Sequence, residues 1–205
     1  MVGSSPASLK MEPIILASGS LRRQEYFRLM GLPFSIMPSM INESPKKNLH
    51  PKEFAEDLSI RKVKKIIEVL QGRTPSWICG ADTVVSVNGE IFGKPVGRED
   101  AKRMIVRLQG RDHKVITAVA LFKGREKSID CRSVESVVSF APLSEDEVEW
   151  YLNTGEWQGV AGAYKIQGLA SCFVSHIKGS YSAVVGLPVH EFYVMLKDNG
   201  YSYVF

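Results

Sequence analysis

An apolar run that ends in small residues and leads into a helical pattern sets the fold class of this chain. The run Ile14-Ile15-Leu16-Ala17 predicts a buried strand, and the turn Ser18-Gly19-Ser20-Leu21 follows it. Behind the turn, Arg22-Arg23 opens a helical pattern that ends at Gly31. Open α/β sheets bind ligands at the carboxyl ends of strands, where a helix N-terminus presents free amides to anions. This strand-turn-helix unit therefore predicts an α/β protein with a phosphate site at residues 18–23.

The rest of the chain predicts a mixed sheet rather than a pure alternation of strands and helices. Helical patterns cover residues 51–70, 99–108, 144–153 and 188–199, and strand patterns cover residues 34–37, 77–87, 90–92, 113–122 and 129–140. Asn88-Gly89 predicts a type I′ hairpin turn, and the glycine-rich segment 159–168 predicts a loop. Strands alternate with helices in the first half and cluster in the middle, which favours a mixed α/β sheet.

The length and composition are typical of an ordinary globular protein. The chain has 205 residues, of which 44% are hydrophobic and 23% are charged, and this length is enough to bury a core. We expect residues 1–10 to form a flexible extension and residues 11–205 to form a single domain. No stretch reaches the roughly 18 to 20 apolar residues of a membrane span, and the first ten residues lack the apolar core of a signal peptide. We therefore expect no association with a membrane.

The net charge of the chain indicates which binding partners to expect, and its cysteine content indicates the cellular compartment. The net charge of +4 comes from 26 basic and 22 acidic residues that are scattered, so it favours an anionic partner only weakly. Cys79, Cys131 and Cys172 are odd in number and widely spaced among apolar residues, which predicts reduced core thiols in a cytoplasmic protein. The basic helix face at residues 61–65 lacks interleaved aromatic residues, so nucleic-acid binding is the least favoured function.

Three charged residues beyond the first turn are candidates for a functional site. Asp82 interrupts an apolar strand, where an unpaired carboxylate is costly to bury. It is interpreted either as a polar group satisfied at a bulge or as a general base or metal ligand. Lys62 on the long helix and Lys94 in Gly93-Lys94-Pro95 would by default be solvated surface lysines. The residues alone leave these alternatives open.

Four separated motifs, in this order, resemble those of the Maf family of nucleotide pyrophosphatases. They are ASGSLRRQE at 17–25, GADTVV at 80–85, GKP at 93–95 and AGAYKIQG at 161–168, and the likeness continues through GSYSAVVGLP at 179–188. The resemblance covers the chain from about Ile14 to the last helix. It implies an elongated mixed β-sheet with flanking helices and two lobes around a central cleft, similar to the inosine-triphosphate pyrophosphatases.

The resemblance also implies a reaction and a role for each motif. Family members hydrolyse nucleoside triphosphates between the α and β phosphates, giving the monophosphate and pyrophosphate with the help of a divalent metal cation. Asp82 is the implied catalytic proton acceptor, and Asp82 and Glu43 are the implied ligands of Mg²⁺ or Mn²⁺, for which oxygen ligands are suited. The implied substrate-binding residues are Ser18, Ser20, Arg22, Arg23, Lys62, Thr83, Lys94 and Gln167. A homodimer is implied as well.

The substrate follows from three of these positions. The subfamily that acts on dTTP and UTP carries Arg, Thr and Gln where this chain has Arg22, Thr83 and Gln167, so dTTP and UTP are the expected substrates, with modified pyrimidine nucleotides as variants. Leu21 replaces the usual proline of the first motif, and we expect activity to survive this change. Asn42 stands at a position that is often acidic, which predicts a lower metal affinity or more reliance on Glu43. A non-catalytic nucleotide-binding regulator of septum formation is the alternative.

Overall fold

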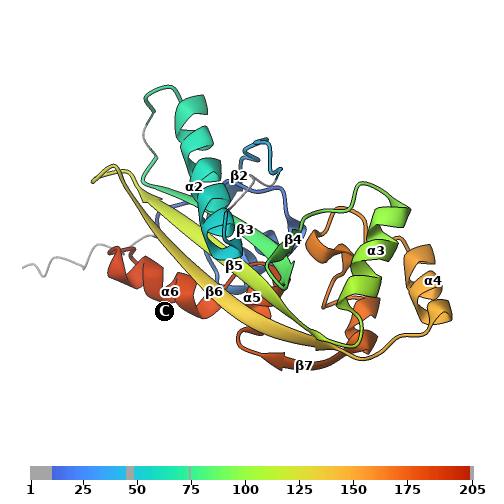
Figure 1. The fold of residues 1–205 in the computed structure, drawn as a ribbon. Helices are drawn as coiled ribbons and strands as arrows, with labels where there is room; N and C mark the ends of the chain where they lie inside the picture. Colours follow the sequence, from blue (N-terminus) through green and yellow to red (C-terminus); the bar gives the residue numbers. More distant parts are fainter. Residues whose placement is uncertain (1–10, 45–48, 74, 204–205) are drawn as a thin grey trace, which may run out of the picture.

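A seven-stranded mixed sheet with helices packed against it runs through the protein (Figure 1). The computed structural model describes residues 11–44, 49–73 and 75–203, so the extension predicted for residues 1–10 lies outside the described residues. Within this part, the elements are β1 (Ile14–Leu16), α1 (Leu21–Leu29), β2 (Phe34–Ile36), α2 (Pro51–Val69), β3 (Trp77–Val87), β4 (Glu90–Phe92), α3 (Arg98–Leu108), β5 (Asp112–Lys123), β6 (Ser128–Phe140), α4 (Glu145–Asn153), η1 (Ala161–Ala163), η2 (Leu169–Phe173), β7 (Val174–Lys178), α5 (Tyr181–Val185) and α6 (Val189–Asp198).

The sheet combines parallel and antiparallel pairing. Its order is β2-β1-β3-β5-β6-β7, and β4 pairs with β3 beside this path. β1 is parallel to both β2 and β3, whereas each neighbouring pair in the series β3, β5, β6 and β7 is antiparallel. The mixed sheet and flanking helices that the sequence predicted are confirmed.

Side chains that alternate along β3 bury both faces of the sheet in one lobe. Ile78 faces α2 in a cluster with Val63 and Ile66. Its neighbour Cys79 faces the opposite way, in a cluster with the helices α1 and α6. Because successive strand residues point to opposite faces, one strand serves two hydrophobic layers.

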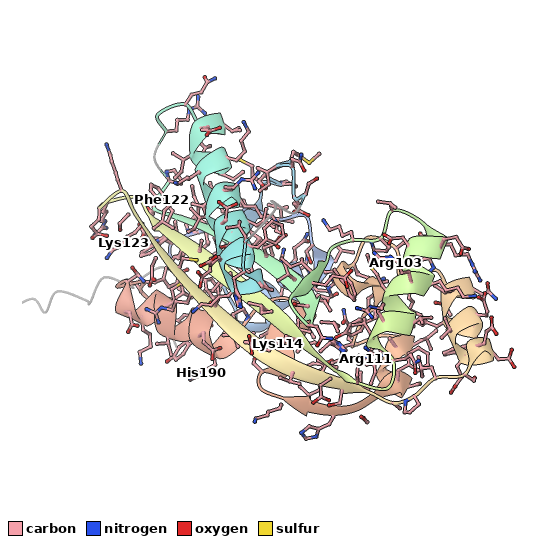
Figure 2. The ribbon with its side chains drawn as sticks, in the orientation of Figure 1. Arg103, Arg111, Lys114, Phe122, Lys123 and His190 are labelled. Atoms are coloured by element: carbon pink, nitrogen blue, oxygen red, sulfur yellow. The ribbon has the colours of Figure 1, made fainter. Side chains whose placement is uncertain are left out.

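A further hydrophobic core lies at the other end of the long strands. It contains the inward side chains of α3, which are the predicted Ala101, Met104, Ile105 and Leu108, together with residues of α4, α5 and the segment 160–173. Figure 2 shows Phe122 and Lys123 at the end of β5 near α2, and Lys114 and Arg111 toward α3. The long pair β5 and β6 therefore connects the two lobes, whereas the expected cleft stays a prediction.

Most element boundaries agree with the sequence analysis. Both residues of the predicted hairpin turn have positive φ, 50° at Asn88 and 83° at Gly89, as a type I′ turn requires. The capping box at Ser144 and the helix start at Pro51 are also confirmed. Among the helices of the described residues, none has both the length and the apolarity needed to cross a bilayer.

The structure corrects the sequence analysis at the cysteines and in the segment 159–168, and it adds two elements. Cys172 is exposed and Cys131 is only partly buried, so of the three free thiols only Cys79 is a core residue. The reason for Cys172 is its place in η2, a short helix with only two buried residues. The segment predicted as a loop at 159–168 contains the single 3₁₀ turn η1. The elements β7 and α5 were not predicted.

A buried histidine joins the two long strands to the loop of the last motif. The ring of His113 on β5 is 2% exposed and packs edge-on against Phe140 and Tyr164. Its Nε2 lies 2.8 Å from the hydroxyl of Tyr164, three residues before Gln167. Burial lowers the pKa of His113 from 6.5 to about 4, so the ring is neutral at pH 7.

This histidine predicts an acid-sensitive part of the stability. The unfolded chain takes up a proton at His113 near pH 6.5, while the folded protein does so only near pH 4, so the free energy of unfolding falls as the pH drops between these values. The loss attributable to this group is about 3 kcal/mol at most. We expect denaturant titrations at several pH values to give a shallower pH slope for His113→Gln than for the wild type. His176→Gln, at an exposed position on β7, is the control and should keep the wild-type slope.

Candidate active site

The register of the first strands places the turn after β1 beside the middle of β3. β1 ends at Leu16, which pairs with Cys79, and the amide of Ala17 donates to the Cys79 carbonyl at 2.8 Å. β3 continues well past this point to Val87. The residues of the turn, Ser18 to Ser20, therefore lie beside the segment of β3 that carries Asp82.

The absence of a side chain at Gly80 lets α2 approach β3 closely. A Cβ atom at Gly80 would lie 2.5 Å from the Ser59 carbonyl oxygen and 2.9 Å from a Val63 methyl. This contact brings Lys62 over β3, where its Nζ lies 2.6 Å from Oδ1 of Asp82. Lys62 is only 5% exposed, so the interpretation as a solvated surface lysine is wrong. Asp82 is 7% exposed and paired.

The carboxylate of Glu43 forms ion pairs with both Lys62 and Lys94. Its Oε1 lies 2.7 Å from Nζ of Lys62, and its Oε2 lies 2.5 Å from Nζ of Lys94. Burial would raise the pKa of Glu43, but the two ammonium groups outweigh burial and lower it from 4.5 to about 2. Lys94 remains more than half exposed, yet it is tied to the site through this ion pair.

Arg61, which sequence reasoning did not single out for the site, holds the segment that carries Glu43. It donates to the carbonyl of Asn42 at 2.9 Å and pairs with Asp57 one turn earlier on α2. Asn42 itself accepts a hydrogen bond from the Ser44 amide through its side chain. The Asn42 side chain therefore organises the turn next to Glu43, while the expected effect of this position on metal affinity stays a prediction.

Arg23 is a buried hub that connects three segments of the chain. Its Nε donates to the Gly186 carbonyl at 2.9 Å, one terminal nitrogen donates to Oγ of Ser18 at 3.1 Å, and the other donates to Oγ1 of Thr83 at 3.2 Å. Gly186 has a φ of 134°, a conformation that glycine adopts without strain. Burial lowers the pKa of Arg23, and the carboxylates of Asp82 and Glu43 counteract this effect.

Thr117, which sequence reasoning missed, extends this network. Its hydroxyl donates to the Ala183 carbonyl at 2.7 Å and lies 2.9 Å from the hydroxyl of Thr83. Because a hydroxyl has one proton, Thr83 must donate to Thr117 while it accepts from Arg23. Since its one proton is used in this way, the Thr83 hydroxyl can only accept a hydrogen bond from a ligand. Thr83 follows Asp82 directly in β3, so the two side chains lie on opposite faces of the strand. The pairing of Thr83 with Thr117 in the sheet register was the missing signal.

The start of α1 offers donors that the protein itself does not use. Arg22 is half-buried, and in the described part of the chain its Nε has no hydrogen-bond partner. Burial and the charge of Arg23 lower the pKa of Arg22. Ser20 is the N-cap residue, and its side chain makes no capping bond to the described residues. The first turn contains no acidic side chain, so the positive end of the helix is left uncompensated.

The loop that carries Gln167 contacts the segment that carries Lys94, through a hydrogen bond between Gly162 and Gly93. The Gly162 amide donates to the Gly93 carbonyl at 3.1 Å, next to Lys94, and Gly162 packs tightly against Val85 of β3. Gln167 is exposed, and its side chain makes no hydrogen bond within the described residues. Contacts unite the ten predicted site residues only in part. Glu43, Lys62, Asp82 and Lys94 form one cluster, and Ser18, Arg23 and Thr83 form a second. Ser20 joins the second cluster only through its backbone amide, which donates to Oγ of Ser18, and the side chains of Arg22 and Gln167 make no hydrogen bond to either cluster within the described residues.

The carboxylates of Asp82 and Glu43 are the groups of the site that could supply oxygen donors to a divalent cation. In the described residues no three His, Cys, Asp or Glu side chains converge into a metal-binding group. Magnesium commonly uses one or two protein carboxylates, with water and substrate phosphates as its other ligands. The donor set fits such a shared site rather than a closed protein cage.

The sequence of this chain is similar to those of known proteins over most of its length. The family model described as Maf-like protein matches residues 13–199. The dTTP/UTP pyrophosphatase of Symbiobacterium thermophilum is 43% identical over 93% of this chain and 96% of that protein, and the one of Pelotomaculum thermopropionicum is 41% identical over 94% and 99%. The solved Staphylococcus aureus Ham1 protein aligns with a TM-score of 0.45 at 14% identity, covering 63% of this chain and 72% of that one.

The close contact at Gly80 gives a testable prediction. We expect Gly80→Ala to lower the free energy of unfolding by about 1–3 kcal/mol, because the added methyl group pushes α2 away from β3. The same shift should separate Lys62 from Asp82. Gly93→Ala is the control, since a Cβ there meets no atom within 4 Å. Equal chemical denaturation midpoints for the two variants would contradict the close contact.

Proposed function

The chain belongs to the Maf family, and from this we propose that it hydrolyses dTTP and UTP to the monophosphate and pyrophosphate. Relatives that carry the name dTTP/UTP pyrophosphatase match it over nearly its whole length. The observation that carries the proposal is the convergence of Lys62 and Lys94 on the carboxylates of Asp82 and Glu43, beside the open start of α1. This arrangement combines cations for a triphosphate with a base for water.

The phosphate groups would bind at the start of α1 and at the cations around it. The unused Nε of Arg22, the hydroxyl of Ser20 and the free amides of the first turn supply donors to phosphate oxygens. Lys94 is exposed enough to reach the same ligand. Arg23 and Ser18 hydrogen-bond each other behind this surface, and Arg23 keeps two of its five N–H donors for a ligand. Charge neutralisation of this kind accounts for most of the catalysis of phosphoryl-group chemistry.

Asp82 is the proposed general base for the attacking water. Its Oδ1 accepts from Lys62, whereas Oδ2 has no hydrogen-bond partner among the described residues. A partner on Oδ1, which is Lys62 in the free protein, holds the carboxyl group in one orientation, and this leaves Oδ2 to take the proton of water. The oxygen of this water attacks the α phosphorus while Oδ2 takes its proton, and the bond between the α phosphorus and the bridging oxygen breaks, so that pyrophosphate leaves.

Asp82 and Glu43 would hold Mg²⁺ or Mn²⁺ together with the substrate phosphates. A bound divalent cation withdraws charge from the phosphate oxygens and stabilises the charge that develops during the reaction. The residues of the protein keep two tasks in this scheme. Both carboxylates would hold the cation, and Asp82 would in addition orient and deprotonate the water.

Base recognition is assigned to Arg22, Thr83 and Gln167. An amide both donates and accepts, which matches the carbonyl and N–H edge of thymine and uracil. The Gln167 side chain is exposed and unpaired within the described structure, so it is free to make such bonds. The Thr83 hydroxyl acts through Arg23, to which it is hydrogen-bonded. Modified pyrimidine nucleotides with the same edge would be accepted too.

The protein is further proposed to be a homodimer of the cytoplasm. A homodimer is carried over from the family resemblance. The three free thiols and the nucleotide substrate support a cytoplasmic protein. Binding of nucleic acid is not proposed, because Lys62 of the basic helix face is buried and Lys65 pairs with Glu68.

Replacing the proposed base tests the reaction. We expect Asp82→Asn to lower pyrophosphate release from dTTP and UTP by at least about a hundredfold, because the amide cannot take a proton, although it can still accept from Lys62. Asp146→Asn, at an exposed residue of α4, is the control and should keep full activity. Circular dichroism spectra should be the same for all three proteins. Wild-type protein that binds dTTP without releasing pyrophosphate would instead support the nucleotide-binding regulator.

Replacing the proposed base-reading amide tests the substrate. We expect Gln167→Glu to raise KM for dTTP and UTP about tenfold, because a carboxylate only accepts and also repels the triphosphate. Gln158→Glu introduces the same charge at another exposed glutamine and should leave KM nearly unchanged. Steady-state rates of pyrophosphate release over a range of substrate concentrations measure the difference. An unchanged KM in Gln167→Glu would remove this residue from substrate binding.

A further inference from the structure

The ammonium group of Lys62 occupies the place between the two carboxylates of the site. Its Nζ lies 2.6 Å from Asp82 and 2.7 Å from Glu43. A third, longer bond of 3.4 Å goes to the Ala81 carbonyl. An ammonium group has three N–H donors, so these three acceptors use all of them. In this arrangement Lys62 has no donor left for a phosphate oxygen.

The carboxylate oxygens are occupied to nearly the same extent. Glu43 has Lys62 on Oε1 and Lys94 on Oε2. Asp82 has Lys62 on Oδ1, and Oδ2 alone of the four oxygens has no ammonium partner in the described part of the chain. A divalent cation that used both carboxylates would compete with an ammonium group at Glu43, because both oxygens of Glu43 already accept from a lysine.

The charge of the whole site opposes a metal ion that arrives alone. Four cations, Arg22, Arg23, Lys62 and Lys94, surround two carboxylates. A free divalent cation would add to an excess of positive charge in a partly buried site, where repulsion is screened less than in water. A nucleoside triphosphate carries more negative charge than one divalent cation neutralises, so the complex of the two complements the same site.

We propose that Lys62 is a resident counter-cation that excludes the divalent metal from the free protein and admits it only together with the nucleotide. This inference rests on the proposed function. When the metal–nucleotide complex enters, the metal takes the place of the ammonium group at the carboxylates, and Lys62 transfers its hydrogen bonds to phosphate oxygens. Metal and nucleotide then favour each other's binding by the same factor, as thermodynamic linkage requires.

The experiment measures binding of Mn²⁺ to the full chain without turnover. Free Mn²⁺ is quantified by electron paramagnetic resonance for the wild type, Lys62→Met and Lys62→Gln. Lys64→Met is the matched control, because it removes an exposed lysine from the same helix. We expect both Lys62 variants to bind Mn²⁺ at least about tenfold more tightly than the wild type, since removal of the ammonium group frees Asp82 and Oε1 of Glu43 and takes away one positive charge. Lys64→Met should bind Mn²⁺ like the wild type.

A second measurement tests the coupling with the nucleotide. Calorimetric titration with α,β-imido-dUTP, which resists cleavage at the reacting bond, is done in Mn²⁺ and in EDTA. We expect Mn²⁺ to strengthen binding of the analogue to the wild type and to Lys64→Met, and to do so much less in the Lys62 variants. Lys62→Gln keeps a donor toward Asp82, so the test does not depend on Lys62→Met folding.

The outcomes separate this inference from the proposed function. Wild-type protein that binds Mn²⁺ alone as tightly as the Lys62 variants overturns the role of Lys62, while binding of the analogue would leave the proposed function standing. An analogue that fails to bind the wild type in Mn²⁺ overturns both. If neither Lys62 variant folds, the wild type still decides: tight binding of Mn²⁺ in the absence of analogue contradicts the inference, and weak binding that the analogue strengthens supports it.

Discussion

The site depends on one buried ion pair, that of Lys62 with Asp82, to which Glu43 adds a second carboxylate. Each of these charges would cost several kcal/mol if it were buried without its partner, so the three groups stabilise one another's positions. The pair also ties α2 to β3, and Glu43 ties the segment after β2 to both. Its geometry is possible only because β3 has a glycine at position 80, where any side chain would collide with the backbone of α2. Packing and charge are thus two aspects of the same contact.

A second network holds β3 from its other face. Asp82 and Thr83 are neighbours in a strand, so their side chains point to opposite sides of the sheet. Asp82 meets Lys62 on the side of α2, while Thr83 meets Arg23 and Thr117, whose hydroxyl binds the backbone of α5. The strand is therefore held between two polar clusters at the position where the reaction would occur. Strand position and side-chain direction at Asp82 are determined from both faces, which is the preorganisation that electrostatic catalysis requires.

Periodic patterns predicted most of the fold, and they failed where local sequence does not determine structure. The long strands, the hairpin turn and the amphipathic α3 repeat a pattern over many residues, and their bounds agree with the structure to within a few residues. By contrast, β7 and α5 are five residues each, and β7 exists through its pairing with β6. The hubs Arg61, His113 and Thr117 act through partners far away in sequence, which periodicity cannot reveal. The burial of Lys62 was missed for another reason, because the nearby Lys64 and Lys65 on α2 are exposed and suggest a solvated face.

The two adjacent arginines show how the helix divides the work at the phosphate site. Successive residues of an α-helix point about 100° apart, so Arg22 and Arg23 cannot share one environment. Arg23 points inward, where its nitrogens bind Ser18, Thr83 and Gly186. Arg22 is half-buried and keeps a buried nitrogen without a partner in the described structure, an arrangement that costs free energy until an acceptor arrives. A phosphate oxygen would supply that acceptor, so the arginine that contributes least to the fold is the one best prepared to bind the substrate.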